Sequence, residues 1–72
     1  MTKYAVVIEW DGESYSAFVP DLPGCISVGD TREDVVQNLR EAIVLHLDGL
    51  RAHGDPVPQP TTTVDYVDVD PG

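Results

Sequence analysis

The amino-acid sequence predicts one α+β domain that spans residues 1–72, with its elements in the order β-β-β-α-β. Two short alternating segments flank a turn, a long segment has apolar residues at helical spacing, and a further alternating segment follows a run of prolines. At 72 residues the chain is close to the size at which a single hydrophobic core becomes marginal. We therefore expect the protein to self-associate.

The first predicted strand runs from Lys3 to Trp10, and the second runs from Ser14 to Val19. Asp11-Gly12-Glu13 is a turn signal between them, so the pair is predicted to be a β-hairpin. The first strand has apolar residues on both faces, which is typical of a central strand covered on each side. One face carries Tyr4, Val6, Ile8 and Trp10, and the other carries Ala5 and Val7.

A rigid loop is predicted after the second strand. Pro20 and Pro23 lack backbone donors, and Gly24 follows, so the hydrogen-bond ladder cannot continue here. We expect the loop to be ordered, with Leu22 as its apolar anchor. The next segment, residues 25–28, is predicted to be a short third strand that completes an antiparallel meander.

A long helix is predicted from Arg32 to about His53. Thr31 is suited to cap its amino terminus, Gly54 can adopt the left-handed conformation at its end, and Pro56 prevents continuation. One continuous arc of this helix is apolar and is expected to pack on the sheet. The arc comprises Val35, Val36, Leu39, Ala42, Ile43, His46, Leu47 and Leu50, whereas Val44 and Leu45 fall outside it and are expected to be exposed.

The last predicted strand spans residues 61–69 and follows an extended connector with prolines at positions 56, 58 and 60. A single layer of helix cannot bury both faces of this strand, so we predict that its apolar residues form the interface of a homodimer or higher homo-oligomer. Acidic residues at positions 65 and 68 would repel each other across a symmetric contact. The alternative is that a different protein covers this strand. The predicted interface residues are Val64, Tyr66, Val67 and Val69.

The charge of the chain argues against binding to nucleic acid. Thirteen acidic and four basic side chains give a formal net charge of -9, whereas affinity for phosphates comes from clustered lysine and arginine. A basic protein partner fits this surface, and simple solubility is the alternative explanation of the charge. The lone Cys25 cannot form an intrachain disulfide, and no apolar run reaches the roughly 20 residues of a membrane span. We expect a soluble cytoplasmic protein without contact to membranes.

No catalytic signature is present in the sequence: it has no glycine-rich phosphate loop, no metal-binding cysteine pair and no HExxH pattern. His46 is expected to be a hydrogen-bonded core histidine, His53 a helix-terminal cation or a solvated side chain, and Cys25 a small buried hydrophobic residue. Clustered acids could hold metal if Glu9 lay near Asp65, Asp68 or Asp70, but Glu41 on the helix is predicted to point away from the sheet. We therefore expect no metal, no cofactor and no enzymatic activity.

The residues 4–60 resemble the HicB antitoxin family. The resemblance rests on Tyr4-Ala5-Val6-Val7-Ile8-Glu9, on Phe18-Val19-Pro20-Asp21-Leu22-Pro23-Gly24-Cys25, on Gly29-Asp30-Thr31-Arg32-Glu33, on the helix from Glu41 to Leu50, and on the alternating prolines. It implies a reduced ribonuclease H-like fold with strand order 3-2-1-4, a mixed sheet in which the last strand is parallel to the first. Many members also carry a carboxyl-terminal DNA-binding domain, to which residues 1–72 show no resemblance.

In that family the amino-terminal domain neutralises a small RNA-cleaving toxin of the HicA type by covering its active site. The resemblance therefore implies a HicA-like toxin as partner, and no direct DNA binding by this domain. A solitary, self-associating module without a toxin is the alternative, and a metal-dependent nuclease is a third and more remote possibility. The residues predicted to contact the partner are Glu9, Asp11, Asp21, Leu22 and Pro23.

Overall fold

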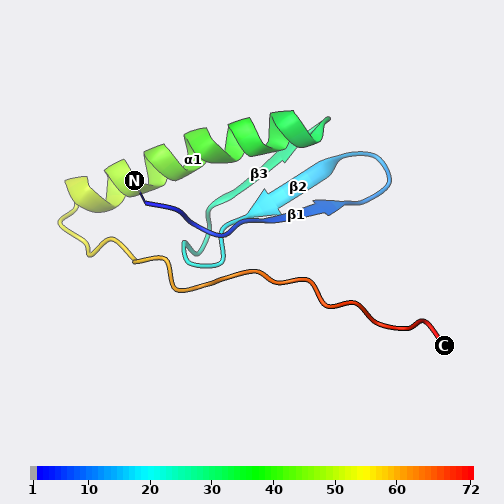
Figure 1. The fold of residues 1–72 in the computed structure, drawn as a ribbon. Coiled ribbons are helices and arrows are strands. Elements are labelled where there is room, and N and C mark those ends of the chain that lie inside the picture. Colours follow the sequence, from blue (N-terminus) through cyan, green and yellow to red (C-terminus); the bar gives the residue numbers. More distant parts are fainter. Residues whose placement is uncertain (1) are drawn as a thin grey trace.

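The computed structural model describes residues 2–72, which form a three-stranded antiparallel sheet, one long helix laid across it, and a carboxyl-terminal segment without regular structure (Figure 1). The strands are β1 (Val7–Trp10), β2 (Tyr15–Phe18) and β3 (Ile26–Gly29), and the helix is α1 (Arg32–Ala52). The strand order is β1-β2-β3, with both pairs antiparallel. The predicted α+β class and meander are confirmed, and each strand is shorter than or shifted from its predicted range.

The register of the strands decides which side chains face the helix. Ile8 lies opposite Ala17, which lies opposite Ser27, and these three residues point toward α1. Val7, Phe18 and Ile26 form the neighbouring row and point to the other side of the sheet. The sheet thus has one face under the helix and one face that no other element covers within residues 2–72.

The helix begins and ends where the sequence predicts. The hydroxyl of Thr31 accepts a hydrogen bond of 3.0 Å from the backbone N–H of Asp34, which is the expected amino-terminal cap. At the other end the backbone N–H of His53 donates to the carbonyl of Gly49 at 3.1 Å, and Gly54 adopts a φ of 71°. The ring nitrogen Nδ1 of exposed His53 also lies 2.8 Å from the Gly49 carbonyl, as suits a residue at the helix terminus.

The core lies between α1, β2 and the loop that follows β2. Val35 and Leu39 of the helix are buried, the rest of the predicted apolar arc is half-buried, and Val44 and Leu45 are exposed, as predicted. Gly29 permits the helix to start directly against β3, because a Cβ atom there would lie 2.6 Å from the backbone nitrogen of Val35. The fully or nearly buried residues are Ala17, Val19, Leu22, Cys25, Val35 and Leu39.

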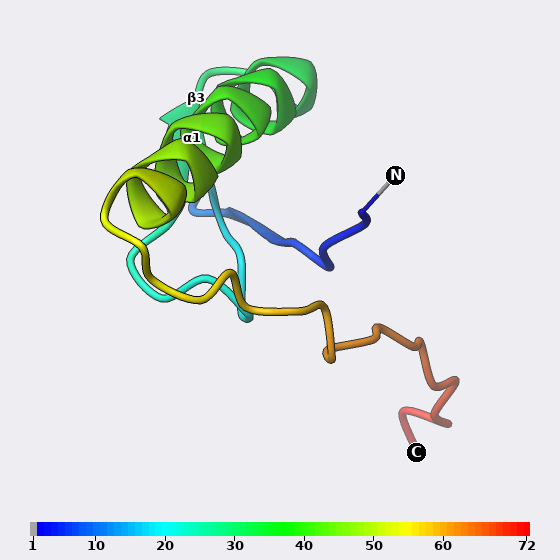
Figure 2. The same cartoon turned by 90° about the vertical axis from the view of Figure 1, so that its left-hand side faces the viewer.

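Two predictions about the sheet are wrong for the single chain. Residues 61–69 form no strand, and β1 is consequently an edge strand rather than a central one. The segment extends away from the domain (Figure 2), and the radius of gyration of 14.3 Å exceeds the roughly 11 Å expected of a compact domain of this length. Hydrogen bonds that hold the connector elsewhere, described below, are the physical reason.

His46 also differs from its prediction. Its side chain is half-buried, and no hydrogen bond to its ring forms among residues 2–72. Cys25 does match its prediction, because it is 4% exposed and unpaired, and burial raises the pKa of its thiol. A buried thiol with a raised pKa is a poor nucleophile.

Candidate functional site

The loop between β2 and β3 is a compact structure built around Leu22. The backbone N–H of Leu22 donates to the carbonyl of Val19 at 3.1 Å, that of Cys25 donates to Leu22 at 3.0 Å, and that of Val19 donates to Cys25 at 3.1 Å. The Leu22 side chain is completely buried, which confirms its predicted role as anchor of the loop. Because it is buried, the side chain is not displayed to a partner in this conformation.

Asp21, in the same loop, holds the carboxyl-terminal segment. One of its carboxylate oxygens accepts hydrogen bonds from the backbone N–H groups of Thr61 and Thr62, both at 3.0 Å. The other accepts from their hydroxyls at 3.1 and 2.8 Å, respectively. These bonds lower the pKa of Asp21, with the backbone N–H of Thr62 as the largest cause. A second tether joins the hydroxyl of Tyr4 to the carbonyl of Pro58 at 2.6 Å.

Asp11 has a local structural role in the β1–β2 hairpin. Its carboxylate accepts hydrogen bonds from the backbone N–H groups of Glu13 and Ser14, at 2.8 and 2.9 Å. The bonds from Ser14, and then from Glu13, lower the pKa of Asp11. Gly12 completes the turn with a φ of 100°. The carboxylate of Asp11 therefore stabilises the turn, in the manner of an Asx turn.

The five residues predicted to contact a partner do not form one patch. Glu9 and Asp11 lie at the hairpin end of the sheet, whereas the loop with Asp21, Leu22 and Pro23 lies at the opposite end of β2 (Figure 1). Among the five, Glu9 and Pro23 are exposed. The Glu9 carboxylate makes no hydrogen bond within residues 2–72. Their part in partner binding stays a prediction.

The uncovered face of the sheet carries an apolar patch, which we call the open face. It consists of Val7, Phe18, Ile26 and Val28, with Glu9 beside them in the row that joins Glu9, Ser16 and Val28. Ile26 and Val28 are each 67% exposed and Phe18 is 38% exposed. Sequence reasoning missed Ile26 and Val28, although their alternation with Cys25 and Ser27 is the signal that could have placed them on the outer face.

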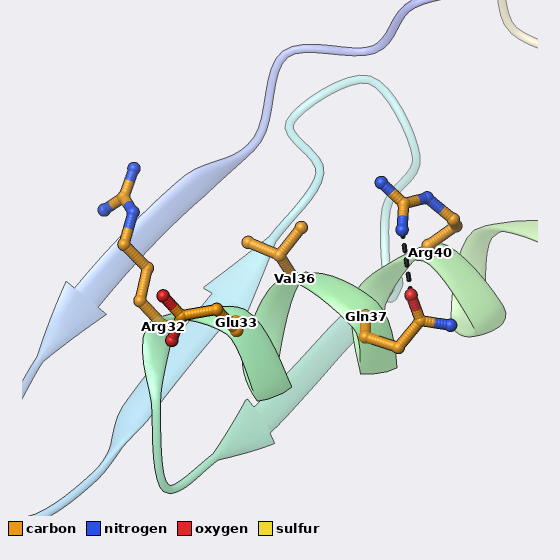
Figure 3. A pocket seen from close by; sticks show the side chains of 5 residues that line it. All are labelled: Arg32, Glu33, Val36, Gln37 and Arg40. Atoms are coloured by element: carbon orange, nitrogen blue, oxygen red, sulfur yellow. Dashed lines mark hydrogen bonds between the residues drawn. The ribbon is translucent and has the colours of Figure 1, made fainter.

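A second uncovered surface is an apolar groove between the amino-terminal segment and α1, which we call the β1 groove. Its volume is about 580 Å³, and Lys3 and Arg40 contribute positive charge to it. Arg32, Val36 and Arg40 rise from one side of the helix close by, and Arg40 donates a hydrogen bond of 2.8 Å to Gln37 (Figure 3). The apolar lining of the groove comprises Tyr4, Val6, Val36, Leu39, Ile43, Val44 and Leu47.

Neither a metal centre nor a membrane span is evident in the part of the chain that the structure describes. Across residues 2–72, no group of three His, Cys, Asp or Glu side chains is placed so that it could hold a metal ion. Within the same range, α1 lacks the combination of length and apolar character that crossing a bilayer requires. The distinctive features of the described domain are thus its two uncovered apolar surfaces.

Comparison with known proteins identifies the family to which such a domain belongs. The family model for the HicB-like antitoxin of bacterial toxin–antitoxin systems matches residues 4–72. The chain therefore belongs to the HicB-like antitoxin family, as the sequence resemblance predicts.

Individual relatives agree with this assignment. The crystal structure of the N-terminal domain of the Burkholderia pseudomallei antitoxin HicB matches with a TM-score of 0.71 and 39% sequence identity, over 81% of this chain and 69% of that one. A UPF0150 protein of Synechocystis is 46% identical over 58 residues, which cover 79% of this chain and 73% of the relative. An uncharacterized 14.9 kDa protein of Haemophilus phage HP1 is 34% identical over 89% of this chain, but the match spans only 48% of the phage protein.

Proposed function

We propose that this protein is an antitoxin that binds a small, basic, HicA-type RNA-cleaving toxin and neutralises it by covering its active site. Membership of the HicB-like family and the likeness to the N-terminal domain of a HicB antitoxin carry this proposal. The role is stoichiometric binding without chemistry. A net charge of -9 would accelerate encounter with a basic partner, because complementary fields steer association.

The open face is the surface that we assign to the toxin. Exposed apolar residues in one contiguous row serve as anchors in protein interfaces, and a charged residue at the rim favours a partner of opposite sign. The row of Val7, Phe18 and Ile26 supplies the anchors, and Glu9 supplies the charge. The loop with Asp21 and Leu22 then supports the fold instead of making the main contact.

Co-expression tests this proposal directly. The chain is produced together with a small basic protein encoded by a neighbouring reading frame, whose expression alone arrests growth, and growth and complex formation are measured. We expect the unmodified chain to restore growth, and the double variant Ile26→Lys, Val28→Lys to lose both rescue and complex formation. Leu45→Lys is the matched control, since Leu45 is 72% exposed on α1, away from the open face. Failure of the unmodified chain to bind or rescue would contradict the proposal.

The absence of catalysis is tested with the same protein. Addition of magnesium or manganese is expected to produce no cleavage of an RNA–DNA hybrid. Hydrolysis that disappeared in Glu9→Gln would show that the acidic residues form a metal-dependent nuclease. We also expect no sequence-specific DNA complex at physiological salt, because the negative surface repels phosphates.

A further inference from the structure

The outer edge of β3 carries the backbone groups of Ile26 and Val28. In an antiparallel ladder, alternate residues direct both their N–H and their C=O groups toward the neighbouring strand. The backbone N–H of Val19, just after β2, donates to the carbonyl of Cys25 at 3.1 Å, so Cys25 and, by alternation, Ser27 point toward β2. The N–H and C=O groups of Ile26 and Val28 therefore point away from β2, toward the position that a further strand would occupy.

The composition of β3 makes this edge prone to pairing with another chain. Ile26 and Val28 are β-branched and each 67% exposed, and residues 25–29 contain neither a charged residue nor a proline. The register of β3 with β2 is continuous, without a bulge. Natural sheets protect an apolar edge with charges, prolines, bulges or a covering element, because such an edge recruits strands of other molecules. Protection of the β3 edge must therefore come from another part of the chain.

Asn38 of α1 provides this protection. Its side-chain nitrogen Nδ2 donates a hydrogen bond of 2.8 Å to the carbonyl of Val28, which is one of the outward-pointing groups. A strand added at this edge would donate to the same carbonyl from its backbone N–H. The Asn38 amide therefore occupies the place of the donor that an added strand would supply.

The packing of α1 on β3 brings Asn38 to this position. The Ser27 hydroxyl donates to the carbonyl of Val35 at 2.9 Å, so the start of the helix is held against the strand. Asn38 follows Val35 by three residues, which places both on the same side of the helix. The neighbouring amide of Gln37 instead accepts a hydrogen bond of 2.8 Å from Arg40 on the helix surface. The contact with the strand edge thus belongs to position 38.

Without this contact, the β3 edge would be complementary to itself. An antiparallel pair of β3 strands from two copies, centred on Ser27, would place Ile26 of each copy opposite Val28 of the other. Both residues direct their backbone groups outward, so each such pair would exchange two hydrogen bonds, and their apolar side chains would meet on one face of the joined sheet. No like charges would oppose each other, because β3 is uncharged.

We propose that Asn38 closes the β3 edge against pairing with β3 of a second copy of this chain. Self-pairing would bring a second copy directly beside Ile26 and Val28 of the open face. The hydrogen bond between Asn38 and Val28 therefore leaves these two residues free for a different protein. This role is independent of which protein binds the open face and of any association on the β1 side.

The mass of the full chain in solution, measured by sedimentation equilibrium at increasing protein concentration, tests this proposal. Asn38→Ala opens the edge and is expected to form species of about twice the mass of the unmodified chain at the same concentration. Alanine favours the helix at this exposed position, so the helix content should be unchanged. Asn38→Lys places a charge at the edge and is expected to keep the mass of the unmodified chain.

Ser27→Ala is the matched control, because it removes the other hydrogen bond between α1 and β3 without exposing an outward-pointing group. It is expected to keep the mass of the unmodified chain. Equal masses of Asn38→Ala and the unmodified chain at every concentration would overturn the proposal. Equal association of Asn38→Ala and Ser27→Ala would also overturn it, since weakened packing of the helix would then be the cause.

Hydrogen exchange locates the contact. The backbone amides of Ile26 and Val28 point outward and are expected to exchange rapidly in the unmodified chain. In Asn38→Ala both amides should become protected as the concentration rises, whereas the amides of Ser27 and Gly29, which point toward β2, should keep their protection. Association of Asn38→Ala without protection of Ile26 and Val28 would place the contact elsewhere and contradict the proposal.

Discussion

The two sides of the sheet differ in how completely one chain covers them. On the β3 side, α1 packs across the strand, the Ser27 hydroxyl donates to the carbonyl of Val35 at 2.9 Å, and the Asn38 amide donates to the carbonyl of Val28 at 2.8 Å. On the β1 side, the edge has no partner among residues 2–72, and an apolar groove lies between α1 and the segment that precedes β1. The β3 side is covered within one chain. The β1 side carries apolar residues typical of a buried region, but no other element of residues 2–72 covers it.

This difference shows that an apolar pattern predicts burial without specifying which chain provides it. β1 carries apolar residues on both faces, as a central strand does, yet it lies at an edge in the single chain. A 72-residue domain has a small hydrophobic core, so apolar surfaces that remain exposed to water cost a substantial part of its stability. Association with another protein chain would bury these surfaces, and because there are two of them, two different partners can bind.

The largest effect is expected at the covered side of the domain. Leu22→Asp places an unpaired charge in a fully buried position, which costs about 3–5 kcal/mol or more. The total stability expected for 72 residues is only roughly 4–11 kcal/mol. We expect the variant to be largely unfolded by circular dichroism and thermal denaturation. Leu45→Asp, at an exposed helix position, is the control and should change stability by less than about 0.5 kcal/mol; equal losses in both variants would contradict the core described here.

A smaller effect is expected where the helix meets β3. Gly29→Ala would bring a Cβ atom to 2.6 Å from the backbone of Val35, so the start of α1 must shift. We expect a destabilisation of about 1–3 kcal/mol in urea denaturation, the usual range for overpacking. Gly49→Ala is the matched control, because its Cβ meets nothing within 4 Å, and it should stabilise the helix by up to about 1 kcal/mol. A neutral Gly29→Ala would show that this contact is loose.

The tether of the carboxyl-terminal segment should respond to pH. The pKa of Asp21 is lowered in the folded chain, so the four hydrogen bonds from Thr61 and Thr62 stabilise the fold above the ordinary aspartate pKa. This contribution is lost as the pH falls through the lowered pKa, where the carboxylate is protonated. Amide exchange at residues 61 and 62 should therefore accelerate in strong acid, and Asp21→Asn should show fast exchange at neutral pH. Identical exchange in Asp21→Asn and the unmodified chain would argue against the tether.

Local patterns explain how much of this fold the sequence predicts. Four features depend on residues within a few positions of one another, and all match the structure: the hairpin, the Leu22 anchor, the Thr31 cap and the end of α1 just before Gly54. The course of the last segment depends instead on bonds across 40 residues or more, from Asp21 to Thr61 and from Tyr4 to Pro58. No periodicity encodes such pairings.

The five predicted contact residues stay a prediction, but the structure shows what several of their side chains do within the fold. Three of the five residues expected to contact a partner are committed to the fold: Leu22 is buried, and Asp11 and Asp21 accept backbone hydrogen bonds. Acidity alone does not distinguish a carboxylate that meets a partner from one that stabilises a turn. Glu9 lies on an exposed surface, and the apolar patch beside it appears only when the register of three strands is known.

Hydrogen exchange of the full chain without toxin, measured across a range of protein concentrations, tests most directly whether the β1 side depends on another chain for its cover while the β3 side does not. Protection of the amides in residues 4–9 should rise with concentration, whereas α1 and β3 should keep the same relative protection throughout. A rise in protection along β3, with no change along the β1 edge, would contradict the account.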